Sequence, residues 1–244
     1  MKHLRSLTIF SLLFIGSLFI GCTKSEVAIH VAELREGIVI GGHRDIPGGA
    51  SLTPEGDKVV LPGNDGIVQI VDWKSWEVLH TLTGHTGHVH SARFSPDGEK
   101  IITSSDDGTL RIFEVDSGTE LRTLEHTGGI IFASFSPDET QIITGDKNGI
   151  VRLWTADMET ELQTFVGHTD AVPSIIFSPD GTKIATSSDD GTARLWDIAT
   201  GRELDRLEGL LGDHVSQFLP DGTGVLLLGI DDAFIWDVGE GMVR

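Results

Sequence analysis

The chain has 244 residues and carries 37 acidic against 18 basic side chains, a formal net charge of −19. This balance repels nucleic acid phosphates and anionic lipid surfaces, and it leaves basic proteins or divalent cations as partners. The chain has one cysteine, so no internal disulfide is available and apolar burial must hold a domain together.

Residues 1–21 have the pattern of a secretory signal. Lys2 and Arg5 form a positive start, and the stretch from Leu7 to Ile20 is apolar apart from Ser, Thr and Gly. A membrane-spanning helix needs about 20 such residues, so this stretch fits the apolar region of a signal peptide better.

Cys22 directly follows that region in Phe19-Ile20-Gly21-Cys22. This resembles the lipobox of bacterial lipoproteins, except that Phe19 stands where Leu is usual. The resemblance implies a diacylated Cys22 and an anchor in the cell envelope, with Thr23 favouring the outer membrane. An ordinary signal peptide and an uncleaved anchor with an incidental cysteine stay open as alternatives. Residues 22–33 are then a short tether.

A Ser-Pro-Asp-Gly-like motif recurs through the rest of the chain. Its prolines are Pro54, Pro96, Pro137, Pro179 and Pro220, spaced by 42, 41, 42 and 41 residues. A constant period of this length predicts one supersecondary unit copied five times over residues 34–244.

The fourth unit shows the pattern within each copy. Pro and Gly turn signals separate four short runs of strand-forming residues, and no helical periodicity is present. The four runs are Ala171–Phe177, Lys183–Ser188, Thr192–Ile198 and Glu203–Leu207. Four-stranded antiparallel sheets repeated around an axis predict an all-β, five-bladed β-propeller.

The recurring Gly-His, Ser-Pro-Asp-Gly, Asp-Gly and Trp-Asp landmarks resemble those of the WD-repeat family. The resemblance implies a buried hydrogen-bonded chain of His168, Thr186, Asp190 and Trp196 in the fourth unit. Buried polar groups of this kind must satisfy one another, which favours a structural role over catalysis. The second unit keeps three members of the chain, with Phe113 at the Trp place: His85, Thr103 and Asp107.

The other units depart further from the pattern. The third has Asn148 in place of the turn Asp. The residues retained elsewhere are His126, Thr144 and Trp154 in the third unit, His43 and Asp65 in the first, and Trp236 with a shifted His214 in the fifth.

Strand counting predicts how the ring closes. No outer strand follows the fifth unit, whereas Leu34–Ile40 precedes the first Gly-His at the right distance to serve as one. We expect this segment to complete the last blade, giving a closed monomer without a free edge. A fragment that pairs with another chain and an open arc remain alternatives.

The sequence gives no sign of catalysis or of a cofactor. None of the five predicted innermost strands contains the paired carboxylates of an acid–base site. The turns Asp106-Asp107, Asp189-Asp190 and Asp231-Asp232 share a rim, yet turns on different blades lie too far apart to share one cation, so no metal is expected. Polar residues near the channel mouth are His90, Arg93 and His214, and Lys147 lies beside the turns.

The resemblance to the WD-repeat family, whose propellers commonly engage partners through the histidine-bearing rim, implies a non-catalytic protein-interaction platform, and the net charge of −19 gives it an acidic face. The alternative is a propeller that binds a small ligand, such as a sugar or a peptide, in its central channel. An envelope hydrolase comes third.

Overall fold

The protein consists of short antiparallel β-sheets in series. The computed structural model describes residues 49–126, 128–210, 214–228 and 233–238. Four sheets have four strands and the fifth has three. The strands are β1 (Ser51–Leu52), β2 (Lys58–Pro62), β3 (Val68–Asp72) and β4 (Val78–Leu82); β5 (Val89–Phe94), β6 (Lys100–Ser105), β7 (Thr109–Glu114) and β8 (Glu120–Glu125); β9 (Ile130–Phe135), β10 (Gln141–Asp146), β11 (Val151–Thr155) and β12 (Glu161–Phe165); β13 (Ser174–Phe177), β14 (Lys183–Ser187), β15 (Thr192–Asp197) and β16 (Glu203–Glu208); β17 (His214–Phe218), β18 (Gly224–Leu228) and β19 (Ala233–Asp237).

The all-β prediction and the four-stranded repeat are confirmed in this part of the chain, where each strand pairs antiparallel with the next. The third and fourth strands share a register shift at one equivalent position in four sheets. It falls at Ile70/Val71, Ile112/Phe113, Leu153/Trp154 and Leu195/Trp196. A bulge at a fixed place bends each outer strand in the same way.

The Ser-Pro turn explains why the first two strands of each sheet meet. In the fourth sheet the Ser178 hydroxyl donates to Asp180 at 2.6 Å, and Asp180 accepts the Thr182 N–H at 3.0 Å. Gly181 adopts a φ of 67°, which costs a glycine little. The motif therefore fixes the connection between β13 and β14 by local hydrogen bonds.

The apolar core lies between consecutive sheets. Separate clusters of buried side chains join the first sheet to the second, the second to the third, the third to the fourth and the fourth to the fifth. A further cluster contains Val59, Leu61 and Val71 of the first sheet, with Trp73 and Trp76 packed against it. The second, third and fourth sheets thus bury both faces against their neighbours, as expected for a repeat architecture.

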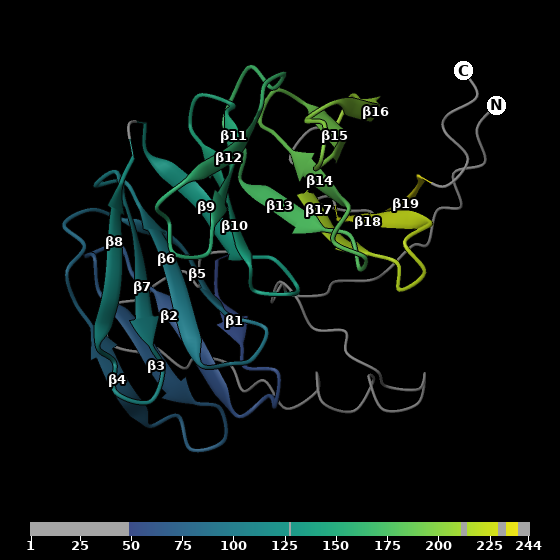
Figure 1. The fold of residues 1–244 in the computed structure, drawn as a ribbon. Coiled ribbons are helices and arrows are strands. Elements are labelled where there is room, and N and C mark those ends of the chain that lie inside the picture. Colours follow the sequence, from purple (N-terminus) through teal and green to yellow (C-terminus); the bar gives the residue numbers. More distant parts are fainter. Residues whose placement is uncertain (1–48, 127, 211–213, 229–232, 239–244) are drawn as a thin grey trace, which may run out of the picture.

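The sheets succeed one another in chain order around a curve, with β5, β9, β13 and β17 toward the middle (Figure 1). Contacts between β5 and β9 and between β13 and β17 support this arrangement. Within the described residues, the fifth sheet is β17-β18-β19 and no strand pairing joins it to the first. The predicted closing segment, Leu34–Ile40, lies outside the described residues, as do residues 46–48 of the predicted innermost strand Ile46–Thr53.

Candidate functional site

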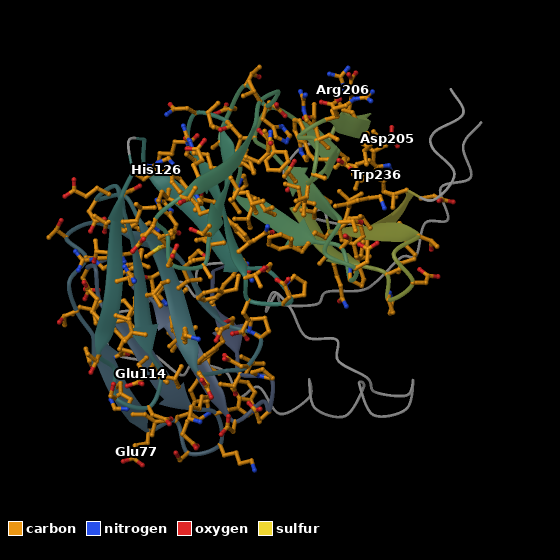
Figure 2. All side chains as sticks on the ribbon, viewed as in Figure 1. Glu77, Glu114, His126, Asp205, Arg206 and Trp236 are labelled. Carbon is orange, nitrogen blue, oxygen red and sulfur yellow. The ribbon has the colours of Figure 1, made fainter. Side chains whose placement is uncertain are left out.

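Two rims are defined by the turns. The histidine rim carries the turns before each innermost strand and the Asp turns after each second strand. The proline rim carries the Ser-Pro turns and the turns between third and outer strands. Figure 2 places His126, on the histidine rim, at the opposite end of the molecule from Glu77 and Glu114.

The fourth sheet brings its four predicted residues together. The His168 Nδ1 lies 3.0 Å from Asp190 Oδ2, and its Nε2 lies 2.7 Å from Thr186 Oγ1. The Trp196 indole donates to the same Thr186 hydroxyl at 2.9 Å. These distances fit a neutral imidazole that donates from Nδ1 to the carboxylate and accepts at Nε2 from the threonine.

Local sequence makes room for this arrangement. A Cβ at Gly167, just before His168, would lie 2.5 Å from Arg194 Nη1 and 2.9 Å from the Trp196 ring. Any side chain there would collide with the arginine and the tryptophan. In the Gly-His pair, the glycine therefore allows the backbone to approach Arg194 and Trp196 closely, and the histidine supplies the imidazole of the network.

The second sheet repeats the geometry without the indole. His85 lies 3.0 Å from Asp107 and 2.7 Å from Thr103, and Phe113 occupies the Trp position. In both sheets the histidine side chain is almost fully buried. The Thr103 hydroxyl thus lacks the indole N–H that Thr186 accepts.

Electrostatics hold the two networks in fixed protonation states. Burial lowers the pKa of His85 and of His168, so both are neutral at pH 7. Burial alone would raise the pKa of Asp190, but hydrogen bonds from Thr192, the Thr169 N–H and His168 lower it to about 2. The pKa of Asp107 is lowered in the same way. Every polar group in these networks has a partner, as buried polar groups require.

Sequence reasoning missed a second layer around each network. Thr192 donates to Asp190 at 2.6 Å, and Arg194 pairs with Glu203 of the outer strand at 2.6 Å. The second sheet has the same pair in Arg111 and Glu120. The signal was available: an Asp-Gly-Thr-x-Arg pattern occurs at 107–111 and at 190–194, and a Glu begins three outer strands.

The side-chain hydrogen bonds in the third sheet differ from those expected from the sequence. Asn148 does not replace the turn carboxylate. Buried Asp146 does so: it accepts the N–H groups of Asn148 and Ile150, each at 2.9 Å, and it pairs with Arg152 at 3.0 Å. The His126 Nε2 accepts from Arg152 at 2.8 Å and is not bonded to Thr144.

The cause lies one residue before the histidine. Glu125 stands where Gly167 stands in the fourth unit, where a Cβ would meet the arginine. Arg152 therefore takes another position, beside the imidazole. Trp154 still donates to Thr144 at 3.0 Å.

The histidine rim also links neighbouring sheets. Asp106, after β6, lies 2.5 Å from the His90 Nε2 and 2.6 Å from Lys147 Nζ of the third sheet. His88 packs edge-on against His90, with ring centroids 4.4 Å apart. These half-buried or exposed side chains leave a mixed-charge surface where the second and third sheets meet.

The structure describes the remaining predicted residues only in part. Cys22, His43 and the Asp231-Asp232 turn lie outside the described residues, and of His214 only the strand position is described. Asp65 accepts the Ile67 N–H at 3.1 Å. Among the described side chains, no group of three or more His, Cys, Asp and Glu could hold a metal ion. No helix in the described part of the chain is long and apolar enough to cross a bilayer.

A comparison with known protein families finds the same repeat in this chain. The family model "WD domain, G-beta repeat" matches residues 76–114, 118–155 and 159–197. Each match starts at the outer strand of one sheet and ends on the third strand of the next, so each sequence repeat joins two sheets. No curated protein matches the chain. Residues 76–197 thus consist of three consecutive WD repeats, which supports assignment of the protein to the WD-repeat family.

Proposed function

We propose that the protein is a non-catalytic scaffold for protein–protein interaction, anchored in the bacterial cell envelope. The observation that carries the proposal is the burial of the His–Thr–Asp networks. Their hydrogen bonds are all used within the sheets, so these groups stabilise the repeats and are not presented to a substrate. The turns on the rims of each repeat remain available to contact a partner.

The histidine rim of the second to fourth sheets is the proposed contact surface. It presents Asp106, Lys147, Asp170 and Asp189, all exposed, with half-buried His90 among them. Turns from three repeats contribute to it, so a partner touches several sheets at once. The net charge of −19 favours a basic partner and faster association at low ionic strength.

Ring closure by the N-terminal segment is part of the proposal. The fifth sheet, as described, ends at β19, and the first sheet has a buried apolar cluster to which sheets two to five contribute nothing. Leu34–Ile40 placed beside β19 would bring these two sheets together and remove a free edge. Deleting residues 34–40 should then turn a monomer into a larger or polydisperse species in light scattering. An unchanged monomer after the deletion contradicts closure.

The envelope anchor is proposed from Cys22 and the apolar stretch before it. Metabolic labelling of the cells with palmitate should mark the protein and not a Cys22→Ser variant. Equal labelling of both proteins would place the lipid elsewhere, and absence of label would favour an ordinary signal peptide.

Co-purification from native membranes tests the scaffold role. A partner that depends on the histidine rim should be retained by the wild-type protein and lost with Lys147→Glu. Lys183→Glu, on the proline rim, is the matched control because it makes the same charge change at the other end of a sheet. Equal recovery with both variants would exclude the histidine rim. Turnover of a substrate by the purified protein would overturn the non-catalytic assignment.

A further inference from the structure

The second sheet turns an unusual set of polar groups toward the third. Ser91 lies opposite Ser104 in the register of β5 and β6, and Arg93 lies opposite Ile102. Residues two apart on a strand share a face, so Ser91, Ser104 and Arg93 lie on the face that carries Ile102. Ile102 packs in the core between the second and third sheets, which fixes the direction of that face.

Three polar atoms of these groups have no hydrogen-bond partner within the described part of the protein. The Ser91 and Ser104 hydroxyls and the Arg93 Nε are buried atoms without a hydrogen bond. Buried polar atoms are rarely left unpaired, because an unmade hydrogen bond carries the full desolvation cost. Three such atoms on one face point to a group that is bound there.

The fourth sheet shows what the same serine pair does when it is satisfied. Ser174 and Ser187 occupy the equivalent opposed positions. Ser174 donates to the Val215 carbonyl at 2.6 Å, and Ser187 accepts the Val215 N–H at 3.2 Å. In the fourth sheet the pair therefore fastens the next innermost strand, whereas in the second sheet both hydroxyls remain available.

Arg93 differs from the other arginines that the structure describes. Arg111, Arg122, Arg152, Arg194 and Arg206 each have a carboxylate partner, and Arg202 is exposed. Arg93 forms no ion pair in the same set of residues, and its guanidinium carbon lies 4.6 Å from the centre of the Phe132 ring on β9. An aromatic face replaces only part of the hydration that a buried cation loses.

The guanidinium of Arg93 is buried without a carboxylate partner among the described residues, and a buried charge of this kind is costly. Burial lowers the pKa of its guanidinium to about 10, so the group remains charged at neutral pH. Yet the residue as a whole is only half-buried, so solvent still reaches part of it. Because solvent reaches part of this side chain, an anion from solution can reach its buried guanidinium.

We propose that Arg93, Ser91 and Ser104 form a binding site for a carboxylate at the inner end of the interface between the second and third sheets. The guanidinium fork matches a planar carboxylate in a bidentate arrangement, the two serine hydroxyls are free to donate, and the Phe132 ring holds the guanidinium plane. The carboxylate comes from an acidic side chain or from the C-terminus of a bound peptide. The site involves two adjacent sheets and depends neither on ring closure nor on the scaffold role.

Thermal unfolding of the full chain in detergent tests the site, with sodium acetate compared against sodium chloride at equal ionic strength. Acetate at several times its Kd should raise the Tm of the wild-type protein by about 2–4 °C. Arg93→Ser places in this repeat the residue that Ser51 and Ser134 supply in the first and third repeats, and it should abolish the shift. Arg122→Ser, which removes an exposed arginine, should retain it.

The source of the carboxylate is resolved with two short peptides. One has a glutamate side chain and an amidated C-terminus, and the other has only alanines and a free C-terminal carboxylate. Saturable movement of the Arg93 Nε–H signal in a nitrogen-15 spectrum should occur with at least one, and the peptide that produces it identifies the source. Arg93→Lys keeps the charge without the fork and should weaken binding about tenfold.

An equal acetate shift in wild type and Arg93→Ser would overturn the proposal. So would an Arg93 Nε–H signal that neither acetate nor either peptide moves, since ordered water alone would then satisfy these groups. Either result would leave the proposed scaffold untouched, because partner recovery from membranes is measured separately.

Discussion

The indole of Trp236 donates a hydrogen bond to Asp205 Oδ2 at 3.2 Å, across from the third strand of the fifth sheet to the outer strand of the fourth (Figure 2). In the fourth sheet the equivalent indole, that of Trp196, bonds to Thr186 of its own sheet. The fifth sheet lacks that acceptor, because Leu227 takes the threonine position in the β18–β19 register. The bond lost within the sheet is thus replaced by one that ties two sheets together.

Asp205→Ala should loosen the fifth sheet selectively. Losing the acceptor of a buried indole costs about 1 kcal/mol, which corresponds to roughly fivefold faster amide exchange in β18 and β19. Hydrogen exchange read by mass spectrometry measures this. Asp205→Asn keeps an acceptor oxygen and serves as the control. Adding Leu227→Thr to Asp205→Ala should restore protection, and an unchanged exchange rate in Asp205→Ala would show that the bond contributes nothing.

Thr186→Val should be among the most damaging single changes in the described sheets. One hydroxyl serves both Trp196 and His168, so its removal leaves two buried polar nitrogens unpaired. The expected loss is about 2–4 kcal/mol of unfolding free energy, measured by urea denaturation. Thr144→Val is the matched control: Thr144 bonds to Trp154 but not to His126, so we expect roughly half the effect. Equal losses would contradict the double role of Thr186.

Stability should fall in mild acid because of four histidines, His85, His88, His126 and His168. Burial lowers the pKa of all four imidazoles in the folded state, so the unfolded chain takes up their protons first. Their contribution is complete above the unfolded pKa of about 6.5 and is lost as pH falls toward the folded value. Urea midpoints measured from pH 7.5 down to pH 4.5 should therefore decrease below about pH 6.5. A constant midpoint over this range would contradict burial of the neutral rings.

The repeat and its internal networks could be predicted because they depend on spacing along the chain. His168, Thr186 and Asp190 fall at fixed distances from a Gly-His and an Asp-Gly turn, and local turn chemistry sets the strand lengths. Contacts between sheets could not be predicted in this way. The bond from Trp236 to Asp205 and the unpaired state of Arg93 depend on which side chains face each other across an interface, and the repeat pattern contains no information on that.

The third sheet shows a different limit. Asn148 occupies the position that the pattern assigns to a carboxylate, whereas Asp146, two residues earlier, performs the role. A motif reading compares equivalent positions, so it cannot detect a carboxylate that reaches the same N–H groups from a neighbouring position. The absence of Gly before His126 was the sequence signal that this unit would differ.

Asp146→Ala should therefore destabilise the third sheet far more than Asn148→Ala. The first change removes the acceptor of two backbone N–H groups and the partner of Arg152 in a buried setting, at a cost of about 3 kcal/mol or more. Asn148 contributes its backbone N–H to this site, which alanine retains, so its replacement should cost less than about 1 kcal/mol. Chemical denaturation of the two variants measures the difference. A larger loss for Asn148→Ala would restore the motif reading.

Glu139→Gly should stabilise the protein at neutral pH. Glu139 has a φ of 59° at the turn position where the other four repeats have glycine, with φ values of 67–73°, and a side chain in this region costs about 1 kcal/mol. Its carboxylate also accepts the Asp97 N–H at 2.6 Å, and the loss of this exposed hydrogen bond offsets part of the gain. The net gain expected is about 0.5 kcal/mol in urea denaturation at pH 7.

The pH dependence separates the two contributions of Glu139. Burial, together with the nearby Asp97 carboxylate, raises the pKa of Glu139. Protonation therefore stabilises the folded wild type, and that stability is lost as pH rises from the unfolded pKa through the higher folded value. The advantage of Glu139→Gly should accordingly be larger at pH 7 than at pH 4. Glu139→Gln keeps the backbone strain and an acceptor oxygen but removes the charge, so it should share the pH trend without any strain relief. A glycine variant less stable than wild type at pH 7 would mean that the hydrogen bond to Asp97 outweighs the strain.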